Sequence, residues 1–210
     1  MKVTGFQDTI NWYNQNAVQY AKSIQNIAAL KQIDDFITLL PVTNKKVLDA
    51  GCAAGRDSKL LSEKGAEITG LDLSPELLRI AKAELPQIPF IEGNFLNLPF
   101  ENGTFGGVWS HASLLHCETT DDVLAALGEF YRVLVEGGIL HVYLKVNTRN
   151  KKFDVVKDTL THHDRFFQYF TNDELKDLLH KSGFKLIKME NEKDPVGRAE
   201  VLWVVSLSHK

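Results

Sequence analysis

The polar stretch between the last two apolar runs of this chain restricts its fold more than any other segment. The two runs, Phe184–Glu190 and Val201–Ser208, are separated by residues 191–200, which include the turn formers Pro195 and Gly197. A connection of this length is too short for the crossover helix that joins two parallel strands. The chain is therefore expected to end in an antiparallel hairpin.

Upstream of the hairpin, apolar runs alternate with segments of helical periodicity. This alternation is typical of a mostly parallel sheet with helices on both faces. The strand-like runs are Lys46–Ala50, Glu67–Leu73, Ile88–Glu92, Gly107–His111 and Ile139–Val146, and the helix-like segments are Arg56–Lys64, Pro75–Leu85, Thr120–Leu134 and Thr171–Ser182. Together with the hairpin, these runs predict an α/β fold built on a seven-stranded, mostly parallel sheet.

Two segments lie outside the alternation. Residues 8–40 are predicted to form a helix that ends before Pro41. Its shared face would carry Tyr13, Tyr20, Ile24, Ile27 and Leu30. Residues 147–165 are polar and irregular, which predicts a loop or a short helix. The aromatic stretch Arg165–Phe170 that follows is either buried packing or one wall of a ligand pocket.

Composition excludes several classes of protein. The 210 residues correspond to one domain, and the net charge of −3 disfavours a nucleic-acid partner. The two cysteines, Cys52 and Cys117, are too few for a disulfide framework or a cysteine-based zinc site, and no metal is predicted. His162 and His163 are interpreted as solvated rather than as metal ligands. Because no apolar run spans a bilayer and no signal segment is apparent, we expect no membrane partner and a cytoplasmic location.

The clearest functional signal is the junction between the first strand and the helix after it. Small residues, Gly51, Ala53 and Gly55, let a ligand approach the backbone, and the helix start offers free N–H groups. Asp72 stands at the end of the second strand, where a carboxylate can accept hydrogen bonds from ribose hydroxyls. The pattern favours a nucleoside ligand over the alternative of a tight turn beside a surface acid. It is not the G-x-G-x-x-G motif of dinucleotide-binding proteins.

These motifs resemble those of the class I S-adenosylmethionine-dependent methyltransferases, especially the bacterial group with small-molecule or unknown acceptors. Asp49, Gly51 and Gly55 match the family's pattern, whereas Ala53 replaces its middle glycine. The resemblance covers about Val47–Leu140. It implies a Rossmann-like sheet, S-adenosyl-L-methionine as cofactor and a single methyltransferase domain over residues 1–210. Within that domain we expect a helical lid (1–40), a cofactor-binding half (41–146) and an acceptor-side segment with the hairpin (147–210).

The resemblance also implies roles for individual residues. Asp72 would hold the ribose hydroxyls, Leu73 would pack on the adenine, and Asn94 would replace the usual acid that faces the adenine amino group. Arg56 either pairs with the methionyl carboxylate of the cofactor or is an exposed charge at a helix start. The expected cofactor-binding residues are Asp49, Gly51, Cys52, Ala53, Gly55, Arg56, Asp72, Leu73, Asn94, Phe95, Ser110 and Tyr20.

The expected reaction is an in-line displacement that carries the methyl group to a small-molecule acceptor. A general base is needed only if the acceptor arrives protonated, and His111 is the candidate, with plain lining of the pocket as the alternative. The acceptor pocket is expected where His111–His116, the N-terminal helix and Arg165–Phe170 converge. A tRNA-modifying methyltransferase, an NAD-dependent oxidoreductase and a non-catalytic cofactor-binding module remain as alternatives. The oligomeric state does not follow from these residues.

Overall fold

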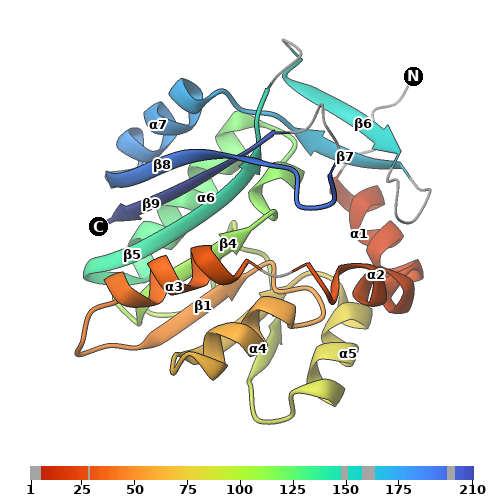
Figure 1. Cartoon of the computed structure of the whole chain (residues 1–210), viewed down its shortest axis with the longest axis horizontal. Coiled ribbons are helices and arrows are strands. Elements are labelled where there is room, and N and C mark those ends of the chain that lie inside the picture. Colours follow the sequence, from red (N-terminus) through yellow and green to blue (C-terminus); the bar gives the residue numbers. More distant parts are fainter. Residues whose placement is uncertain (1–5, 28, 148–150, 158–163, 198–201) are drawn as a thin grey trace.

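The core of the protein is a seven-stranded sheet with the strand order β3-β2-β1-β4-β5-β9-β8 (Figure 1). The computed structural model describes residues 6–27, 29–147, 151–157, 164–197 and 202–210. Strands β1 to β5 run parallel, and β9 is antiparallel to both β5 and β8. The strands are β1 (Lys46–Ala50), β2 (Glu67–Asp72), β3 (Phe90–Glu92), β4 (Phe105–His111), β5 (Leu134–Lys145), β8 (Lys185–Lys193) and β9 (Leu202–His209). The predicted sheet and its terminal hairpin are confirmed.

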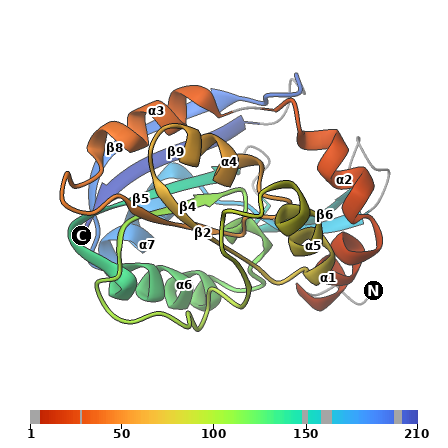
Figure 2. The ribbon, with the colours of Figure 1, turned by 90° about the horizontal axis from the view of Figure 1, so that it is seen from below.

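Helices cover both faces of this sheet (Figure 2). One face carries α3 (Leu30–Leu39), α4 (Arg56–Glu63) and α5 (Pro75–Glu84), and the other carries α6 (Thr120–Val133) and α7 (Asn172–Lys181). Successive strand residues point to opposite faces. Val47 therefore belongs to the hydrophobic cluster on the side of α3, α4 and α5, and Leu48 to the cluster on the side of α6 and α7. Both helix layers are therefore anchored by the same buried central strands.

The starts of two helices follow the capping chemistry that the sequence indicates. The Ser74 hydroxyl accepts the Leu77 N–H at 3.2 Å, and Pro75 occupies the first helical position of α5. Thr171 and Glu174 form a reciprocal capping box at the start of α7. These local signals mark where the two helices begin.

The prediction of one helix over residues 8–40 was wrong. The segment forms α1 (Phe6–Gln15), α2 (Ala17–Ile24) and the separate α3. Helix α3 packs on the sheet through Ile33 and Phe36, whereas Leu30, expected on the face of Tyr13, is 51% exposed. The apolar spacing Ala29, Ile33, Phe36, Leu40 defines a different face, which competes with the predicted one. Helix α3 therefore belongs to the layer on the sheet and is separate from α1 and α2.

The prediction of a loop or short helix over residues 147–165 was also wrong for residues 153–157 and 164–165. Strands β6 (Phe153–Lys157) and β7 (Asp164–Gln168) form a separate two-stranded antiparallel sheet. Aromatic residues suit a strand that has a partner, and Phe166 and Phe167 of β7 are buried. His162 and His163 lie outside the described residues. No helix among the residues described is long and apolar enough to cross a bilayer.

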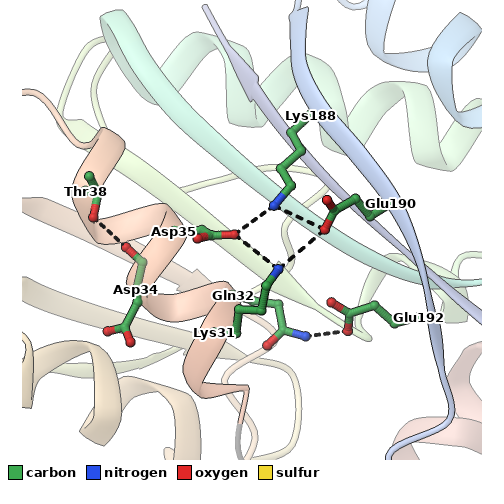
Figure 3. Close-up of polar contacts among 8 residues, drawn as sticks. All are labelled: Lys31, Gln32, Asp34, Asp35, Thr38, Lys188, Glu190 and Glu192. Atoms are coloured by element: carbon green, nitrogen blue, oxygen red, sulfur yellow. Dashed lines mark hydrogen bonds and ion pairs between the residues drawn. The ribbon is translucent and has the colours of Figure 1, made fainter.

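An ion-pair cluster joins α3 to the edge strand β8 (Figure 3). The Lys188 ammonium bonds Asp35 at 3.0 Å and Glu190 at 3.1 Å, and Lys31 reaches the same two carboxylates. Exposed pairs of this kind add little to stability. Charged side chains along an edge strand do oppose pairing with another chain, so the cluster protects the free edge of the sheet.

Candidate active site

A cavity opens at the carboxyl ends of β1, β2 and β4, beneath α1 and α2. It holds about 820 Å³ of space between protein atoms, its open mouth included. β1 pairs with β2 on one side and with β4 on the other, so the cavity lies where the strand order reverses. Open α/β sheets bind their ligands at this point. Of the residues predicted for the site, those that line the cavity are Tyr20, Asp49, Gly51, Cys52, Ala53, Arg56, Asp72, Leu73, Phe95 and His111.

The turn after β1 takes a conformation that only small residues adopt easily. Gly51 has φ +87° and Gly55 has φ +82°, and even Ala53 has φ +48°. The backbone N–H groups of Gly51 and Cys52 both donate to the Leu71 carbonyl, at 2.8 and 3.1 Å. A Cβ on Gly51 would lie 2.4 Å from the Ser113 Cβ. The turn is therefore pressed against the segment that follows β4.

Asp72 ties this turn to the end of β2. Its Oδ2 accepts the Ala53 N–H and its Oδ1 accepts the Ser74 N–H, both at 2.8 Å. Burial raises the pKa of the carboxyl above its usual value, although these backbone bonds oppose the shift. Each oxygen keeps a lone pair, so the carboxylate can also accept bonds from a ligand in the cavity.

Asp49 is almost fully buried at the end of β1 and also lines the cavity. The Ser58 hydroxyl donates to its Oδ2 at 2.6 Å. Burial, aided by the negative charge of Asp57, raises the pKa of Asp49 to about 8. At neutral pH the carboxyl is therefore mostly protonated, and a cationic group of a ligand would favour its ionised form.

Arg56 and Asp57 form a bidentate ion pair at the start of α4. The Nε–Oδ1 distance is 2.7 Å and the Nη2–Oδ2 distance is 2.9 Å, and the Trp109 indole also donates to Oδ2. Burial alone would raise the pKa of Asp57, but the nearby Arg56 charge, together with smaller contributions that include the hydrogen bonds from Arg56 and Trp109, outweighs it and holds this pKa well below the usual range. The guanidinium is thus held at the cavity wall by a carboxylate of its own chain.

His111 ends β4 with its ring inside a stack of aromatic side chains. The ring lies 4.2 Å from that of Tyr143, and Nδ1 is 3.3 Å from Nε2 of His141 on β5. Burial lowers the pKa of His111 to about 4, although the Asp57 charge opposes the shift. The imidazole is therefore neutral at neutral pH.

A second histidine, His116, joins three segments that the sequence predicts to converge. Its Nδ1 lies 2.9 Å from the Phe166 carbonyl of β7, and its Nε2 lies 3.1 Å from the Tyr13 hydroxyl of α1. Arg165 of β7 donates to that same hydroxyl. Burial, aided by the Arg165 charge, lowers the pKa of His116 to about 3. α1, the segment after β4, and β7 therefore meet at one wall of the cavity.

Three of the predicted residues do not line the cavity. Gly55 faces Leu85 and Phe90. Asn94 accepts the Leu96 N–H at 2.9 Å through its Oδ1, and Ser110 is fully buried, 2.8 Å from the Ser113 hydroxyl. Asp57, Leu77 and Gly93 also line the cavity, although the sequence did not point to them. The further lining residues Thr9, Ile10, Ile24, Ala112 and Ser113 lie in the predicted N-terminal helix and in the His111–His116 segment, where the acceptor pocket was expected. Thr9 and Tyr13 are one helical turn apart, a spacing that would have pointed to the first of them.

No group of three or more metal-binding side chains occurs within the described part of the chain. Cys52 and Cys117 are both free and buried. Burial raises the pKa of both thiols, so neither is a reactive thiolate at neutral pH.

Comparison with known proteins finds similarity to methyl-transferring enzymes. A family model described as a methyltransferase domain matches residues 48–142. O-methyltransferase rstn1 of Aspergillus nomiae is 28% identical over 172 residues, which are 76% of this chain and 72% of that protein. A malonyl-[acyl-carrier protein] O-methyltransferase of Enterobacter lignolyticus is 32% identical over 111 residues, 52% of this chain but only 43% of that protein. The chain therefore matches less than half the length of the second relative.

Solved structures show the same fold over nearly the whole chain. The 1,6-didemethyltoxoflavin-N1-methyltransferase of Burkholderia thailandensis, solved with 1,6-didemethyltoxoflavin and S-adenosylhomocysteine bound, has a TM-score of 0.75. It is 20% identical, and the match covers 96% of this chain and 86% of that one. At this identity the likeness concerns the fold alone.

Proposed function

We propose that the chain is a class I S-adenosylmethionine-dependent methyltransferase and that it transfers a methyl group to a small-molecule acceptor in the cavity beneath α1 and α2. S-adenosyl-L-methionine supplies a methyl group that is already activated by a sulfonium. The protein must therefore align the acceptor with the methyl–sulfur bond and keep water away. The alternatives of an oxidoreductase and a non-catalytic binding module lack the support that the comparisons give to this function.

One observation carries the proposal: Asp72, Gly51 and His111 stand at the ends of β2, β1 and β4 and line the same cavity. The residues present suit the cofactor. Its ribose needs a hydrogen-bond acceptor, which Asp72 offers, and its methionyl part needs close access to the backbone, which the turn at Gly51 offers. Asp72 would hold the ribose hydroxyls, and Leu73 and Phe95 would pack on the adenine. The methyl-bearing end would then lie toward β4, on the His111 side.

Asp49 fits the ammonium group of the methionyl part of the cofactor. Its carboxyl lines the cavity at the end of β1, between the places proposed for the adenosine and for the methyl group. A cation there would offset the burial that raises the pKa of Asp49 to about 8. Asn94 already uses its Oδ1 for the Leu96 N–H, so we propose that it shapes the loop beside the adenine.

The acceptor side lies where α1, the segment after β4 and β7 meet. Tyr13 and His116 line the cavity there, and Phe167 packs against His116 with ring centroids 5.2 Å apart. Such a wall suits a partly apolar acceptor of modest size. A tRNA acceptor would need a basic surface, which a chain with a net charge of −3 offers poorly.

We propose that α1 and α2 act as the lid of a single methyltransferase domain and that α3 belongs to the sheet layer. A cytoplasmic location remains part of the proposal. The free cysteines, Cys52 and Cys117, agree with a reducing compartment.

Asp49→Asn is expected to stabilise the ligand-free protein at pH 8 while weakening its affinity for the cofactor. Because the folded-state pKa is raised to about 8, the native state loses stability as pH rises from about 4 toward 8. The asparagine variant does not ionise, so its advantage should be absent at pH 4 and reach a few kcal/mol at pH 8. Urea denaturation at both values measures this difference.

The exposed Asp121→Asn variant is the matched control and should gain nothing between the two pH values. Calorimetry with S-adenosylhomocysteine should show weaker binding for Asp49→Asn only. Equal stability of wild type and Asp49→Asn at pH 8 would contradict the raised pKa of this buried carboxyl.

The proposed function is tested with a metabolite pool incubated with methyl-labelled S-adenosylmethionine and the protein. Label should appear in a small-molecule product and be strongly reduced when Asp72→Ala replaces the wild type. Label in tRNA would support the alternative acceptor class. Cofactor binding without transfer to any pool would instead indicate a binding module.

A further inference from the structure

The hydrogen bond between His111 and His141 decides which ring nitrogen of His111 carries the proton. Nδ1 of His111 and Nε2 of His141 lie 3.3 Å apart, so one of the two donates and the other accepts. His141 is fully buried and stacks on Trp109 with ring centroids 3.6 Å apart. Its Nδ1 has no hydrogen-bond partner in the part of the chain that the structure describes.

The unpartnered nitrogen of His141 favours one tautomer of the pair. If His111 donated, the proton of His141 would sit on Nδ1, as a buried N–H without an acceptor. If His141 donates through Nε2, its Nδ1 is only a bare lone pair. An unsatisfied buried N–H costs more than an unsatisfied lone pair. The equilibrium between the two tautomeric arrangements should therefore favour the second by roughly a factor of ten or more. His141 therefore donates, and Nδ1 of His111 accepts.

This tautomer leaves the proton of His111 on Nε2. None of the described residues bonds this nitrogen, and it is not among the buried atoms that lack a partner. His111 lines the cavity, so Nε2 is the ring atom available to a ligand. The ring thus offers the cavity an N–H donor and no lone pair.

His116 carries its proton on the other ring nitrogen, Nδ1, and both of its ring nitrogens already have hydrogen-bond partners. The Phe166 carbonyl can only accept, so Nδ1 of His116 carries the proton and Nε2 accepts the Tyr13 hydroxyl. The carboxylates of Asp57 and Asp72 are likewise engaged, by Arg56 and by backbone N–H groups. Asp49 stands at β1, where the proposed function places an ammonium group. The described acceptor side therefore offers no unoccupied base.

We propose that His111 binds an anionic oxygen of the methyl acceptor through Nε2–H and does not act as a base, so that the acceptor enters already ionised, as a carboxylate or a phenolate. The inference rests on the proposed function and narrows its substrate class. A neutral N–H beside a sulfonium favours an anion in a site shielded from water. The base role expected for His111 from its position alone is thereby replaced by a positioning contact with the acceptor.

The reaction then balances without a proton transfer. The acceptor oxygen forms a bond to the methyl carbon, and the methyl–sulfur bond breaks with its electron pair going to sulfur. An anion and a sulfonium give a neutral ester or aryl ether and a neutral thioether. The Nε2–H of His111 orients the attacking group and keeps its proton throughout.

Long-range ¹H–¹⁵N correlation spectra of the protein at pH 7 test the tautomer directly, with and without S-adenosylhomocysteine. We expect His111 to be neutral with its proton on Nε2, and His141→Phe to shift it toward a mixture of tautomers. A proton on Nδ1 of His111 in the wild type would overturn the inference. Because the ligand-free spectrum is informative, this result stands apart from any failure of cofactor binding.

The acceptor found with the metabolite pool allows a kinetic test. His111→Gln keeps an N–H donor of similar reach, whereas His111→Leu has none. A donor role predicts kcat/KM for the glutamine variant about ten- to hundredfold above that of the leucine variant, since a hydrogen bond to a charged group is lost only in the latter. Equally poor glutamine and leucine variants would support a base and overturn the inference.

The product distinguishes the two sources of the anion. A methyl ester identifies a carboxylate acceptor and an aryl methyl ether identifies a phenolate, and both support the inference. A methylated amine, thiol or carbon would overturn it while leaving the methyltransferase function intact.

Discussion

The Asp72→Ala variant is expected to bind S-adenosylhomocysteine about ten- to hundredfold more weakly than the wild type, because charge-assisted hydrogen bonds to the ligand are lost. The variant should remain folded. The carboxylate both faces the cavity and holds the Ala53 and Ser74 N–H groups at 2.8 Å. Its removal therefore takes away the proposed ribose contact and loosens the turn that must admit the ligand. Isothermal titration calorimetry measures the change.

Asp72→Asn and Glu67→Ala separate the two contributions. The amide oxygen of the asparagine can still accept one of the two backbone N–H groups, so the cofactor affinity of Asp72→Asn should lie between those of the wild type and Asp72→Ala. Glu67 is exposed at the other end of β2, and its alanine variant should bind like the wild type. An Asp72→Ala protein with unchanged affinity would show that the ribose is held elsewhere.

Gly51→Ala is expected to destabilise the protein by about 2–5 kcal/mol, since a strained φ and a steric overlap add together. The new Cβ would lie 2.4 Å from the Ser113 Cβ on a residue whose φ is +87°. Gly65→Ala is the matched control, because Gly65 has φ +90° and nothing within 4 Å of its position for a Cβ. It should cost only about 1–2 kcal/mol from the backbone.

Ser113→Gly removes the atom with which the new Cβ collides. In a double-mutant cycle, Gly51→Ala should cost less in the Ser113→Gly background than in the wild type, and urea denaturation measures both costs. Ser113→Gly also loses the 2.7 Å bond from its hydroxyl to the Ala50 carbonyl, which the cycle subtracts. Equal costs for Gly51→Ala and Gly65→Ala would contradict the close packing of the turn on the segment after β4.

The features predicted correctly from the sequence are those encoded by short-range patterns. The hairpin β8–β9 follows from the length of one polar connection, and the starts of α5 and α7 follow from Ser74 and Thr171. The turn at Gly51 was found for the same reason, since its small residues are adjacent in the chain. Each of these features is decided within about ten residues.

The features that were missed depend on partners far along the chain. Strand β7 exists because Phe153–Lys157 pairs with it, and α3 packs on the sheet because its Phe36 contacts Trp109. In the site, Tyr13 meets His116 and Arg165 from sequence separations of 103 and 152 residues. The role proposed for His111 likewise depends on a distant partner, since His141 lies on the neighbouring strand, 30 residues away.

Calorimetric titration of the wild-type protein with S-adenosylhomocysteine, S-adenosylmethionine and NAD tests most directly whether this cavity is the cofactor site of a methyltransferase. We expect one site per chain, micromolar-range affinity for both S-adenosyl compounds, and an affinity about ten- to hundredfold weaker in Asp72→Ala. Tighter binding of NAD than of either S-adenosyl compound, or affinity that Asp72→Ala leaves unchanged, would contradict this assignment of the cavity.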